Sequence, residues 1–273
     1  MESMTTTATT TAMLGAGAMG ESVLAGLIRS GRPLDSILVG EKREARAEEL
    51  RQTHGVEVID NHTAVSRADV VVVAVKPQDV TTLLDGLADV LRPGQVVISL
   101  AAGLTLATLE DHVPDGVAVV RVMPNTPALV GQGMSVLSRG SACTDAQLAE
   151  AEELLRACGR VVTLPEAQMD AVTAISGSGP AYVFLVAEAM IESGVRLGLP
   201  RDVATELTVQ TLLGASTMMD ETGKHPALLR EQVTSPGGTT AAAIAQLEDN
   251  RLRAAFAAAT TAAHDHSVRL SGR

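Results

Sequence analysis

Short apolar runs alternate with segments of helical periodicity over residues 12–165. The run at 70–75, Val-Val-Val-Val-Ala-Val, is apolar throughout, as is typical of a parallel strand that is buried on both faces of a sheet. Strands that alternate with helices are typical of an α/β fold built on an open, mostly parallel sheet. The pattern predicts strands at residues 12–14, 36–40, 56–59, 70–75, 95–100, 117–123, 135–137 and 161–164.

Beyond Pro165 the pattern becomes helical, and no further strand signal is convincing. These helices are more apolar than a lone bundle requires, so we expect a subunit interface here, with a self-contained bundle as the alternative. We divide the chain into a tail (1–11), an α/β domain (12–165) and an all-helical domain (166–273). The helices are predicted at residues 181–197, 201–219, 226–233, 239–247 and 250–268.

Composition narrows the classes of partner. The formal net charge of -11 argues against a general affinity for nucleic acid or for an anionic membrane. Aromatic side chains are limited to Tyr182, Phe184 and Phe256, too few for a surface that stacks bases. The apolar run at 70–75 is far too short to cross a bilayer. We therefore expect neither a nucleic-acid partner nor a membrane partner.

Two cysteines, Cys143 and Cys158, are too few for a disulfide framework and lack the spacing of metal ligands. A reduced, cytoplasmic protein without a metal is the simplest interpretation. Residues 1–11 are mostly Thr, Ser and Ala, without a basic region or an apolar core. We expect a disordered tail there rather than a targeting peptide.

A glycine-rich turn joins the first strand to the first helix, in the pattern Gly15-x-Gly17-x-x-Gly20. Gly15 permits a tight turn, Gly17 lets a pyrophosphate approach the backbone, and Gly20 lets the helix pack closely on its strand. The unpaired amides and the positive dipole end of the helix then face the phosphates. A dinucleotide site is predicted here, and a purely structural glycine turn before an alanine-rich helix is the alternative.

The residue after the second strand of such folds meets the adenosine ribose, and this position belongs to Glu41-Lys42-Arg43. Glu41 suits the 2′-hydroxyl of NAD, whereas Lys42 and Arg43 suit the 2′-phosphate of NADP, so both coenzymes stay open. A polar helix start is the structural alternative. Lys76 follows the strand at 70–75, where a parallel sheet delivers groups to a ligand, so we expect it to contact cofactor or substrate.

A second glycine-containing loop, Thr234-Ser-Pro-Gly-Gly-Thr-Thr240, precedes a predicted helix. Amides freed by the glycines, hydroxyl donors and the helix dipole together predict a site for a carboxylate or a phosphate. A simple helix cap would need only one Ser or Thr.

With both loops in view, the chain resembles the pyrroline-5-carboxylate reductases, which reduce a cyclic imine to L-proline with NAD(P)H. The resemblance runs in family order over nearly the whole chain. It implies an N-terminal Rossmann-like dinucleotide-binding domain, a C-terminal substrate and dimerisation domain, homodimers that assemble further, and NADPH or NADH as cofactor. The matching segments are the 15–20 turn, Ala74-Val-Lys-Pro77, Ala101-Ala-Gly103, Pro124-Asn-Thr-Pro127, Asp170-Ala-Val with Ser176-Gly-Ser-Gly-Pro-Ala-Tyr182, and Val233-Thr-Ser-Pro-Gly-Gly-Thr-Thr240.

The resemblance also implies the roles of individual residues. NADP-type members often carry Ser or Thr where this chain has Glu41-Lys42-Arg43, and relatives can carry Asn, a cofactor contact, where this chain has Gln232. The implied cofactor contacts are Gly15, Ala16, Gly17, Ala18, Met19, Gly20, Glu41, Lys42, Arg43, Asn61, Ala74, Val75, Lys76, Pro77, Ala101 and Ala102. The implied contacts to 1-pyrroline-5-carboxylate are Glu166, Ser235, Gly237, Gly238, Thr239 and Thr240.

For the chemistry we choose Thr240 as the catalytic hydroxyl that bonds the ring nitrogen and relays its proton. A cyclic imine is basic enough to be partly protonated near neutrality, so orientation does most of the work. A threonine that bonds the backbone at a helix start is the alternative.

Two other functions stay open. A 3-hydroxyacid dehydrogenase of the 6-phosphogluconate type shares the two-domain plan, but it needs a lysine acid that residues 176–197 do not contain. A non-enzymatic nucleotide sensor would bind NAD(P)H without oxidising it when the imine is added.

Overall fold

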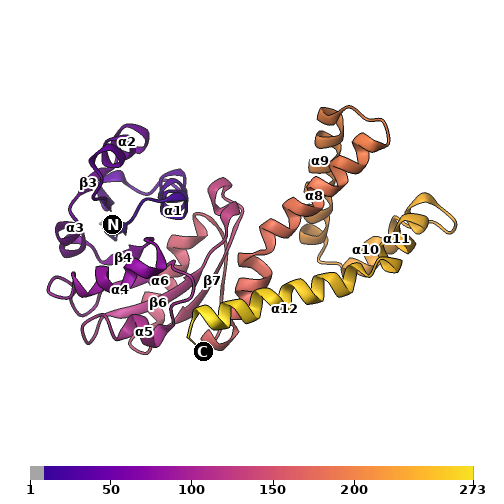
Figure 1. The fold of residues 1–273 in the computed structure, drawn as a ribbon. Helices are drawn as coiled ribbons and strands as arrows, with labels where there is room; N and C mark the ends of the chain where they lie inside the picture. Colours follow the sequence, from indigo (N-terminus) through magenta and orange to yellow (C-terminus); the bar gives the residue numbers. More distant parts are fainter. Residues whose placement is uncertain (1–8, 273) are drawn as a thin grey trace, which may run out of the picture. The chain divides into compact units, whose positions relative to one another are not determined.

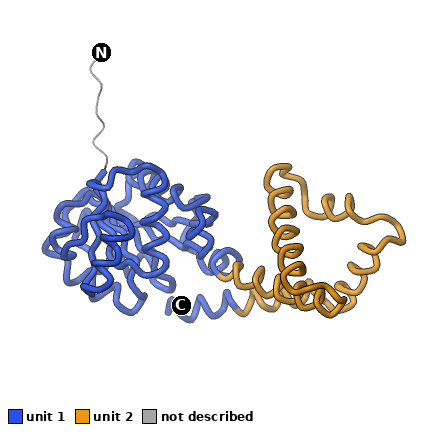
Figure 2. The backbone as a smooth tube through the Cα atoms, turned by 90° about the horizontal axis from the view of Figure 1, so that it is seen from above, with its two compact units in different colours: residues 1–177, 263–273 blue, residues 178–262 orange. Residues whose placement is uncertain are grey.

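The computed structural model describes residues 9–272, so most of the expected tail (residues 1–8) lies outside the described residues. Thr11, which we expected to end the tail, already belongs to the first strand. Two compact units make up the chain, as Figure 2 shows: Met1–Gly177 with Ala263–Arg273, and Ser178–Ala262. The domain limits expected at 11/12 and 165/166 stay a prediction.

The first unit is built on one sheet with the strand order β3-β2-β1-β4-β5-β6-β7-β8 (Figure 1). Neighbouring strands are parallel, except that β7 runs antiparallel to β6. The predicted α/β fold with a mostly parallel sheet is thus confirmed. The strands are β1 Thr11–Leu14, β2 Ile37–Gly40, β3 Glu57–Ile59, β4 Val70–Val73, β5 Val96–Ser99, β6 Ala118–Met123, β7 Gly133–Arg139 and β8 Gly159–Thr163.

Helices cover both faces of this sheet, because alternate strand residues feed two apolar clusters. Met13 packs in the cluster that contains Leu24, Leu50 and Leu154, and Leu14 packs in the cluster that contains Val65, Leu84 and Leu109. One face is therefore covered by α1, α2 and α6, and the other by α3, α4 and α5. The helices are α1 Ala18–Arg29, α2 Glu44–His54, α3 Asn61–Arg67, α4 Pro77–Asp85, α5 Leu106–Glu110 and α6 Asp145–Arg156.

The structure differs from the predicted pattern at two elements and shows the cap of a third. The strand expected to reach residue 75 ends at Val73, because its neighbour β1 ends at Leu14 and the chain then turns at Gly15. The helix α5 was not predicted, since five residues show too little periodicity; Thr105 caps it by accepting from Thr108 N. The N-cap residue of α3 is Asp60, whose carboxylate accepts from Thr63 N.

Short helical turns complete the first unit. The four-residue helix α7, Met169–Val172, continues into a π-helical turn, Thr173–Gly177. Three 3-10 turns lie at Leu34–Ser36, Thr126–Val130 and Glu166–Gln168. The end of the chain returns to this unit, where the buried Ser267 hydroxyl donates to the buried Asp170 carboxylate over 2.7 Å. Gly103 faces Leu270, which lies 3.5 Å from the position of a Cβ at Gly103.

The second unit is helical. Its helices α8 and α9 pack closely where Gly194 faces Ala204, since a Cβ at Gly194 would lie 3.0 Å from the Ala204 side chain. Of the small residues on α9, Ala204 and Thr208 are buried. Many large apolar side chains stay exposed, including Phe184, Leu185, Leu207, Val209 and Leu213. The helices are α8 Gly179–Arg196, α9 Arg201–Thr222, α10 Pro226–Gln232, α11 Thr239–Asp249 and α12 Leu252–Leu270, and α12 belongs to the first unit from Ala263 onward.

Both cysteines are free and buried. Burial raises the pKa of the Cys158 thiol to about 11 and also raises that of Cys143, so neither thiol is a ready nucleophile. Within residues 9–272, no group of three or more His, Cys, Asp or Glu side chains is arranged to hold a metal ion.

Candidate active site

A cavity of about 790 Å³ opens at the carboxyl ends of β1, β2 and β4. Strand order reverses at β1, which has β2 on one side and β4 on the other, and ligands of open α/β sheets bind at such a switch point. The lining includes many of the expected cofactor residues: Gly15, Ala16, Gly17, Glu41, Lys42, Arg43, Asn61, Ala74, Val75 and Lys76.

The three glycines of the turn meet different constraints. Gly15 has a φ of +89°, and its Cβ would lie 2.8 Å from the Val75 side chain. A Cβ at Gly20 would lie 2.2 Å from the carbonyl oxygen of Gly15. Gly17 has an ordinary φ of -71°, and a Cβ there would meet nothing within 4 Å. The fold therefore requires glycine at positions 15 and 20, whereas the open space at Gly17 suits a bound group that approaches the backbone.

Gly17 is also the N-cap residue of α1, and it offers no side chain to satisfy the first amides of the helix. These amides and the helix dipole suit an anion. A pyrophosphate therefore fits this end of the cavity by charge and by room.

Arg46, which sequence reasoning missed, supports the turn from α2. Its guanidinium donates to the carbonyl oxygen of Ala16 over 3.0 Å and pairs with Glu21. The Arg46 side chain is only 17 % exposed. The contact fixes one peptide of the turn from the side of the neighbouring helix, and no short motif in the sequence signals it.

Glu41 follows the last residue of β2, and its side chain is only 7 % exposed. Its carboxylate accepts from the backbone N–H of Arg43 over 3.0 Å and from the Arg43 guanidinium over 3.1 and 3.2 Å. Burial acts to raise the pKa of Glu41, but the hydrogen bonds and charge of Arg43 outweigh burial, and the pKa is lowered. Glu41 is thus held as an anion.

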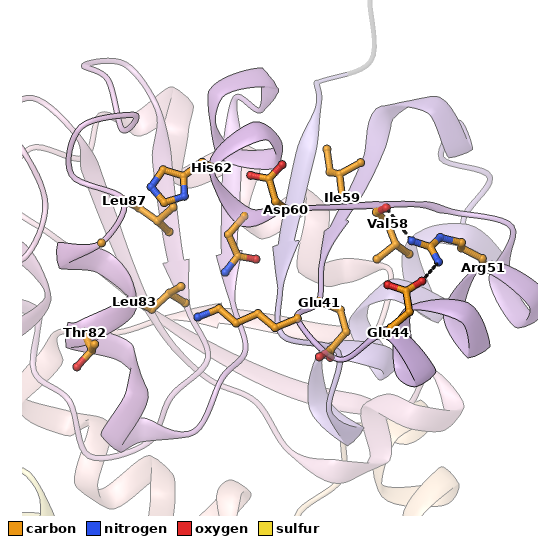
Figure 3. A pocket seen from close by; sticks show the side chains of 13 residues that line it. Glu41, Glu44, Arg51, Val58, Ile59, Asp60, His62, Thr82, Leu83 and Leu87 are labelled. Carbon is orange, nitrogen blue, oxygen red and sulfur yellow. Dashed lines mark hydrogen bonds and ion pairs between the residues drawn. The ribbon is translucent and has the colours of Figure 1, made fainter.

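A second cavity of about 530 Å³ adjoins the first and shares Glu41, Lys42 and Asn61 with it (Figure 3). Asn61 Oδ1 is buried and has no hydrogen-bond partner among the described residues. A Cβ at Gly40 would lie 2.1 Å from this oxygen, so only glycine at the end of β2 leaves room for the Asn61 amide. An unsatisfied buried amide beside a cavity suits a polar ligand.

Apart from Glu41, Lys42 and Asn61, the residues that line this second cavity were not predicted from the sequence. Figure 3 shows His62 and Leu87 near one another, with Thr82 and Leu83 below them. Asp79, Thr82, Leu83 and Gly86 follow the i, i+3, i+4, i+7 spacing of one face of α4, and they line one or both cavities. That spacing was the available signal, once α4 was known to border the crevice.

Other expected cofactor residues lie outside both lining sets. Lys76 lines the larger cavity as the N-cap residue of α4, but Pro77 behind it does not. Ala101 is buried in the loop after β5 and Ala102 is exposed. The remaining residues outside both linings are Ala18, Met19 and Gly20 in α1. Contact roles for these residues stay predictions.

Glu166, expected to contact substrate, holds a structural position in the first unit. Its Oε1 accepts from Leu106 N at the start of α5 over 2.6 Å and from the Arg121 guanidinium over 2.8 Å. The Arg121 side chain is 4 % exposed, so Glu166 neutralises a buried charge. Its role toward a substrate stays a prediction.

Asn125, in the Pro-Asn-Thr-Pro segment, is likewise engaged by the protein. It donates to the carbonyl oxygen of Ser176 and accepts from Met134 N. Its side chain thus ties the Pro-Asn-Thr-Pro segment to the π-helical turn and to β7.

The loop at 234–240 lies in the second unit and leads into α11. Gly238 is the N-cap residue of α11 and provides no side-chain cap, and Gly237 has a φ of +69°. Gly238 N donates to the carbonyl oxygen of Ser235 over 3.0 Å. The Thr234 hydroxyl donates to the carbonyl oxygen of Arg230, whereas the Thr240 hydroxyl makes no such hydrogen bond within the described residues. Open amides and hydroxyls therefore meet at the start of α11.

Two family models match the chain. Residues 166–270 match the pyrroline-5-carboxylate reductase dimerisation domain. Residues 10–103 match a family described as NADP oxidoreductase, coenzyme F420-dependent.

Relatives and solved structures agree over nearly the full length. The chain is 46 % identical to a pyrroline-5-carboxylate reductase of Corynebacterium melassecola, over 96 % of this chain and 98 % of the relative. It is 44 % identical to that of Mycobacterium tuberculosis strain CDC 1551, over 95 % and 96 % of the two chains.

Among solved structures, the Coxiella burnetii pyrroline-5-carboxylate reductase superposes with a TM-score of 0.92 at 38 % identity, covering 97 % of this chain and 99 % of that one. A Plasmodium falciparum pyrroline carboxylate reductase with NADP bound has a TM-score of 0.86 at 28 % identity, over 96 % and 98 % of the chains. The chain belongs to the pyrroline-5-carboxylate reductase family.

Proposed function

We propose that this protein reduces the C=N bond of 1-pyrroline-5-carboxylate to give L-proline, with NADPH or NADH as hydride donor. The observation that carries the proposal is the crevice at the switch point of the sheet, where Gly17 leaves open space at an uncapped helix start. Membership in the family supplies the reaction.

The coenzyme would lie along the two adjoining cavities of the first unit. The amides at the start of α1 would hold the pyrophosphate, and Gly17 would let it approach. The residues after β2 would meet the adenosine ribose, and the cavity lined by His62 and Leu83 would take the adenine. Asn61 Oδ1 would gain the partner that it lacks in the protein.

The loop at 234–240 would bind the substrate carboxylate. Its support is local: open amides at the start of α11, the Ser235 hydroxyl, and a left-handed Gly237 that shapes the turn. The loop would come from the same subunit or from a neighbouring one.

A bound dihydronicotinamide would supply a hydride to the imine carbon of the ring, which is C2 of 1-pyrroline-5-carboxylate and becomes C5 of L-proline. The imine nitrogen must carry a proton when the C=N bond becomes a C–N bond, and Thr240 would hold that N–H through its hydroxyl oxygen. Because the imine is itself basic, the chain needs to orient the ring more than to acidify it.

We propose that the helical region pairs two subunits. The exposed apolar side chains of α8 and α9 need a cover, and residues 166–270 match a dimerisation family. Higher assemblies of dimers follow from the family resemblance.

Residues Glu166–Arg196 form the one described run that is long and apolar enough to cross a membrane, by length and composition alone. We propose that a partner subunit covers this run instead. Its α8 segment carries Glu188, Glu192 and Arg196 at successive four-residue steps, a charged stripe that a lipid-facing helix would not tolerate. With the net charge of -11 and two buried free cysteines, we place the enzyme in the cytoplasm without membrane or nucleic-acid partners.

The direct test is a steady-state assay. Purified protein with NADH or NADPH should lose nicotinamide absorbance at 340 nm when 1-pyrroline-5-carboxylate is added, a wavelength fixed by the ~340 nm band of reduced nicotinamide. L-Proline should accumulate in equal amount. Binding of coenzyme without oxidation would instead support a nucleotide sensor and contradict the proposal.

Thr240→Ala should lower kcat/KM for the imine at least about tenfold, equivalent to roughly 1.4 kcal/mol, because the hydroxyl partner of the ring nitrogen is lost. Coenzyme affinity should be unchanged, and Thr240→Ser should restore most of the rate. Thr234→Ala is the matched control, because the Thr234 hydroxyl is bonded to the carbonyl oxygen of Arg230. An unchanged rate in Thr240→Ala removes Thr240 from the mechanism.

Gly17→Val and Gly20→Ala should separate binding from folding. Gly17→Val should keep the melting temperature but weaken NADH binding at least about tenfold, because its side chain fills space left for the ligand. Gly20→Ala should lower the melting temperature, since its Cβ meets the Gly15 carbonyl oxygen at 2.2 Å. Fluorescence titration and thermal unfolding measure the two effects. Tight NADH binding by folded Gly17→Val would refute the placement of the pyrophosphate.

Leu213→Glu should shift the protein from dimer to monomer in sedimentation velocity, because it buries a charge in the apolar face of α9. Gln52→Glu adds the same charge on α2 of the first unit and should leave the dimer intact. A dimer that survives Leu213→Glu would show that this part of α9 is not in the interface.

A further inference from the structure

The coenzyme preference of this chain can be argued from the contacts of Glu41. Glu41 lines both cavities and follows the final residue of β2, so it stands where the adenosine ribose is met in this fold. Its side chain is 7 % exposed, while that of Arg43 is 70 % exposed. The acid therefore lies inside the crevice, and the arginine lies over it from the solvent side.

The Arg43 groups that a 2′-phosphate would use are already engaged. An adenosine 2′-phosphate at this position needs a guanidinium and backbone amides. The Arg43 guanidinium donates to both oxygens of the Glu41 carboxylate, over 3.1 and 3.2 Å, and Arg43 N donates to Oε1 over 3.0 Å. Glu41 thus occupies the anion site of its own chain, and a phosphate must displace it.

A 2′-hydroxyl faces no such competition. An ionised carboxylate only accepts hydrogen bonds and keeps further lone pairs beside those that Arg43 uses, so ribose hydroxyls can donate to it. A phosphate placed against the same carboxylate would set two anions together beside a side chain that is only 7 % exposed, where repulsion is stronger than in bulk water. The pKa of Glu41 is held low by Arg43, so protonation near neutrality would not relieve the repulsion.

Neighbouring charges on the same wall are arranged differently. Glu44 lines the smaller cavity, but its side chain is 84 % exposed and its carboxylate lies 2.9 Å from the Arg51 guanidinium. Figure 3 marks this ion pair with a dashed line. Lys42 also lines both cavities, and its ammonium is a cation that could attract a phosphate. The preference between NADH and NADPH therefore depends on whether the repulsion of a phosphate by Glu41 outweighs its attraction by Lys42.

We propose that Glu41 makes this enzyme select NADH over NADPH, with Arg43 as the positioning residue that holds the acid against the ribose site. The inference rests on the proposed function only in placing a coenzyme in the crevice. It goes beyond that function, which leaves the two coenzymes open.

The test compares two ligands that differ only in the 2′-phosphate. Isothermal titration calorimetry should show that wild-type protein binds ADP-ribose at least about tenfold more tightly than 2′-phospho-ADP-ribose. Glu41→Gln should reduce this ratio at least about tenfold, mainly by tightening the 2′-phospho ligand. The kcat/KM ratio for NADH over NADPH should move in parallel.

Glu44→Gln is the matched control, because it removes the same charge from the same cavity wall away from the end of β2. It should leave the affinity ratio within about twofold of wild type. Arg43→Ala in the Glu41→Gln background should weaken the 2′-phospho ligand again, because the freed guanidinium is then its partner.

Three binding results would each overturn the inference: equal or tighter binding of the 2′-phospho ligand by wild type, an unchanged ratio in Glu41→Gln, or an equal change in Glu44→Gln. A circular-dichroism melt checks that each variant is folded. If ADP-ribose binds selectively but NADH is not oxidised by the imine, the proposed function fails and the inference stands. If the imine is reduced equally well with both coenzymes, the inference fails and the function stands.

Discussion

The close approach of α1 to the sheet is the constraint on which the coenzyme crevice depends. A Cβ at Gly20 would lie 2.2 Å from the Gly15 carbonyl oxygen and 3.0 Å from the Ala74 side chain. Farther along the helix, a Cβ at Gly26 would lie 2.5 Å from the Cys158 sulfur. Glycines at both places keep α1 close to the strands. Its first amides consequently open at the carboxyl edge of β1, where a pyrophosphate can reach them.

The sequence could predict those parts of the fold that depend on residue type and on the spacing of apolar residues along the chain. The all-valine β4 is predictable because burial on both faces of a sheet favours few residue types, and the glycine turn is predictable because only glycine lacks a Cβ. The end of β4 could not be predicted, because the length of its neighbour β1 determines it. Similarly, Asp60 caps α3 while Asn61 turns its amide toward Gly40, a choice that depends on tertiary packing.

The candidate site divides in the same way. Gly15, Gly17 and Lys76 were predictable because they follow strands whose ends must meet at one edge of the sheet. Arg46 and His62 were not, since helix packing brings Arg46 of α2 to the carbonyl oxygen of Ala16 and places His62 of α3 in the wall of the smaller cavity. For Glu166 the family resemblance suggested a contact to substrate. The structure adds an ion pair with the buried Arg121, which the sequence does not predict. That pairing means the residue can be retained for stability even where it also serves a substrate.

The segment after β2 shows why composition alone left the coenzyme open and why contacts narrow it. Glu41, Lys42 and Arg43 include an acid and two bases, so the sequence alone suits the 2′-hydroxyl of NAD as well as the 2′-phosphate of NADP. The structure distinguishes the two charges, because the Glu41 carboxylate is enclosed and the exposed Arg43 guanidinium is bonded to it. Because the Arg43 side chain is 70 % exposed, this ion pair contributes little to stability, and its importance lies in where it holds the carboxylate. Because Arg43 holds the Glu41 carboxylate in the crevice, the chain repels a 2′-phosphate locally. Neither the net charge nor a sequence motif predicts this repulsion.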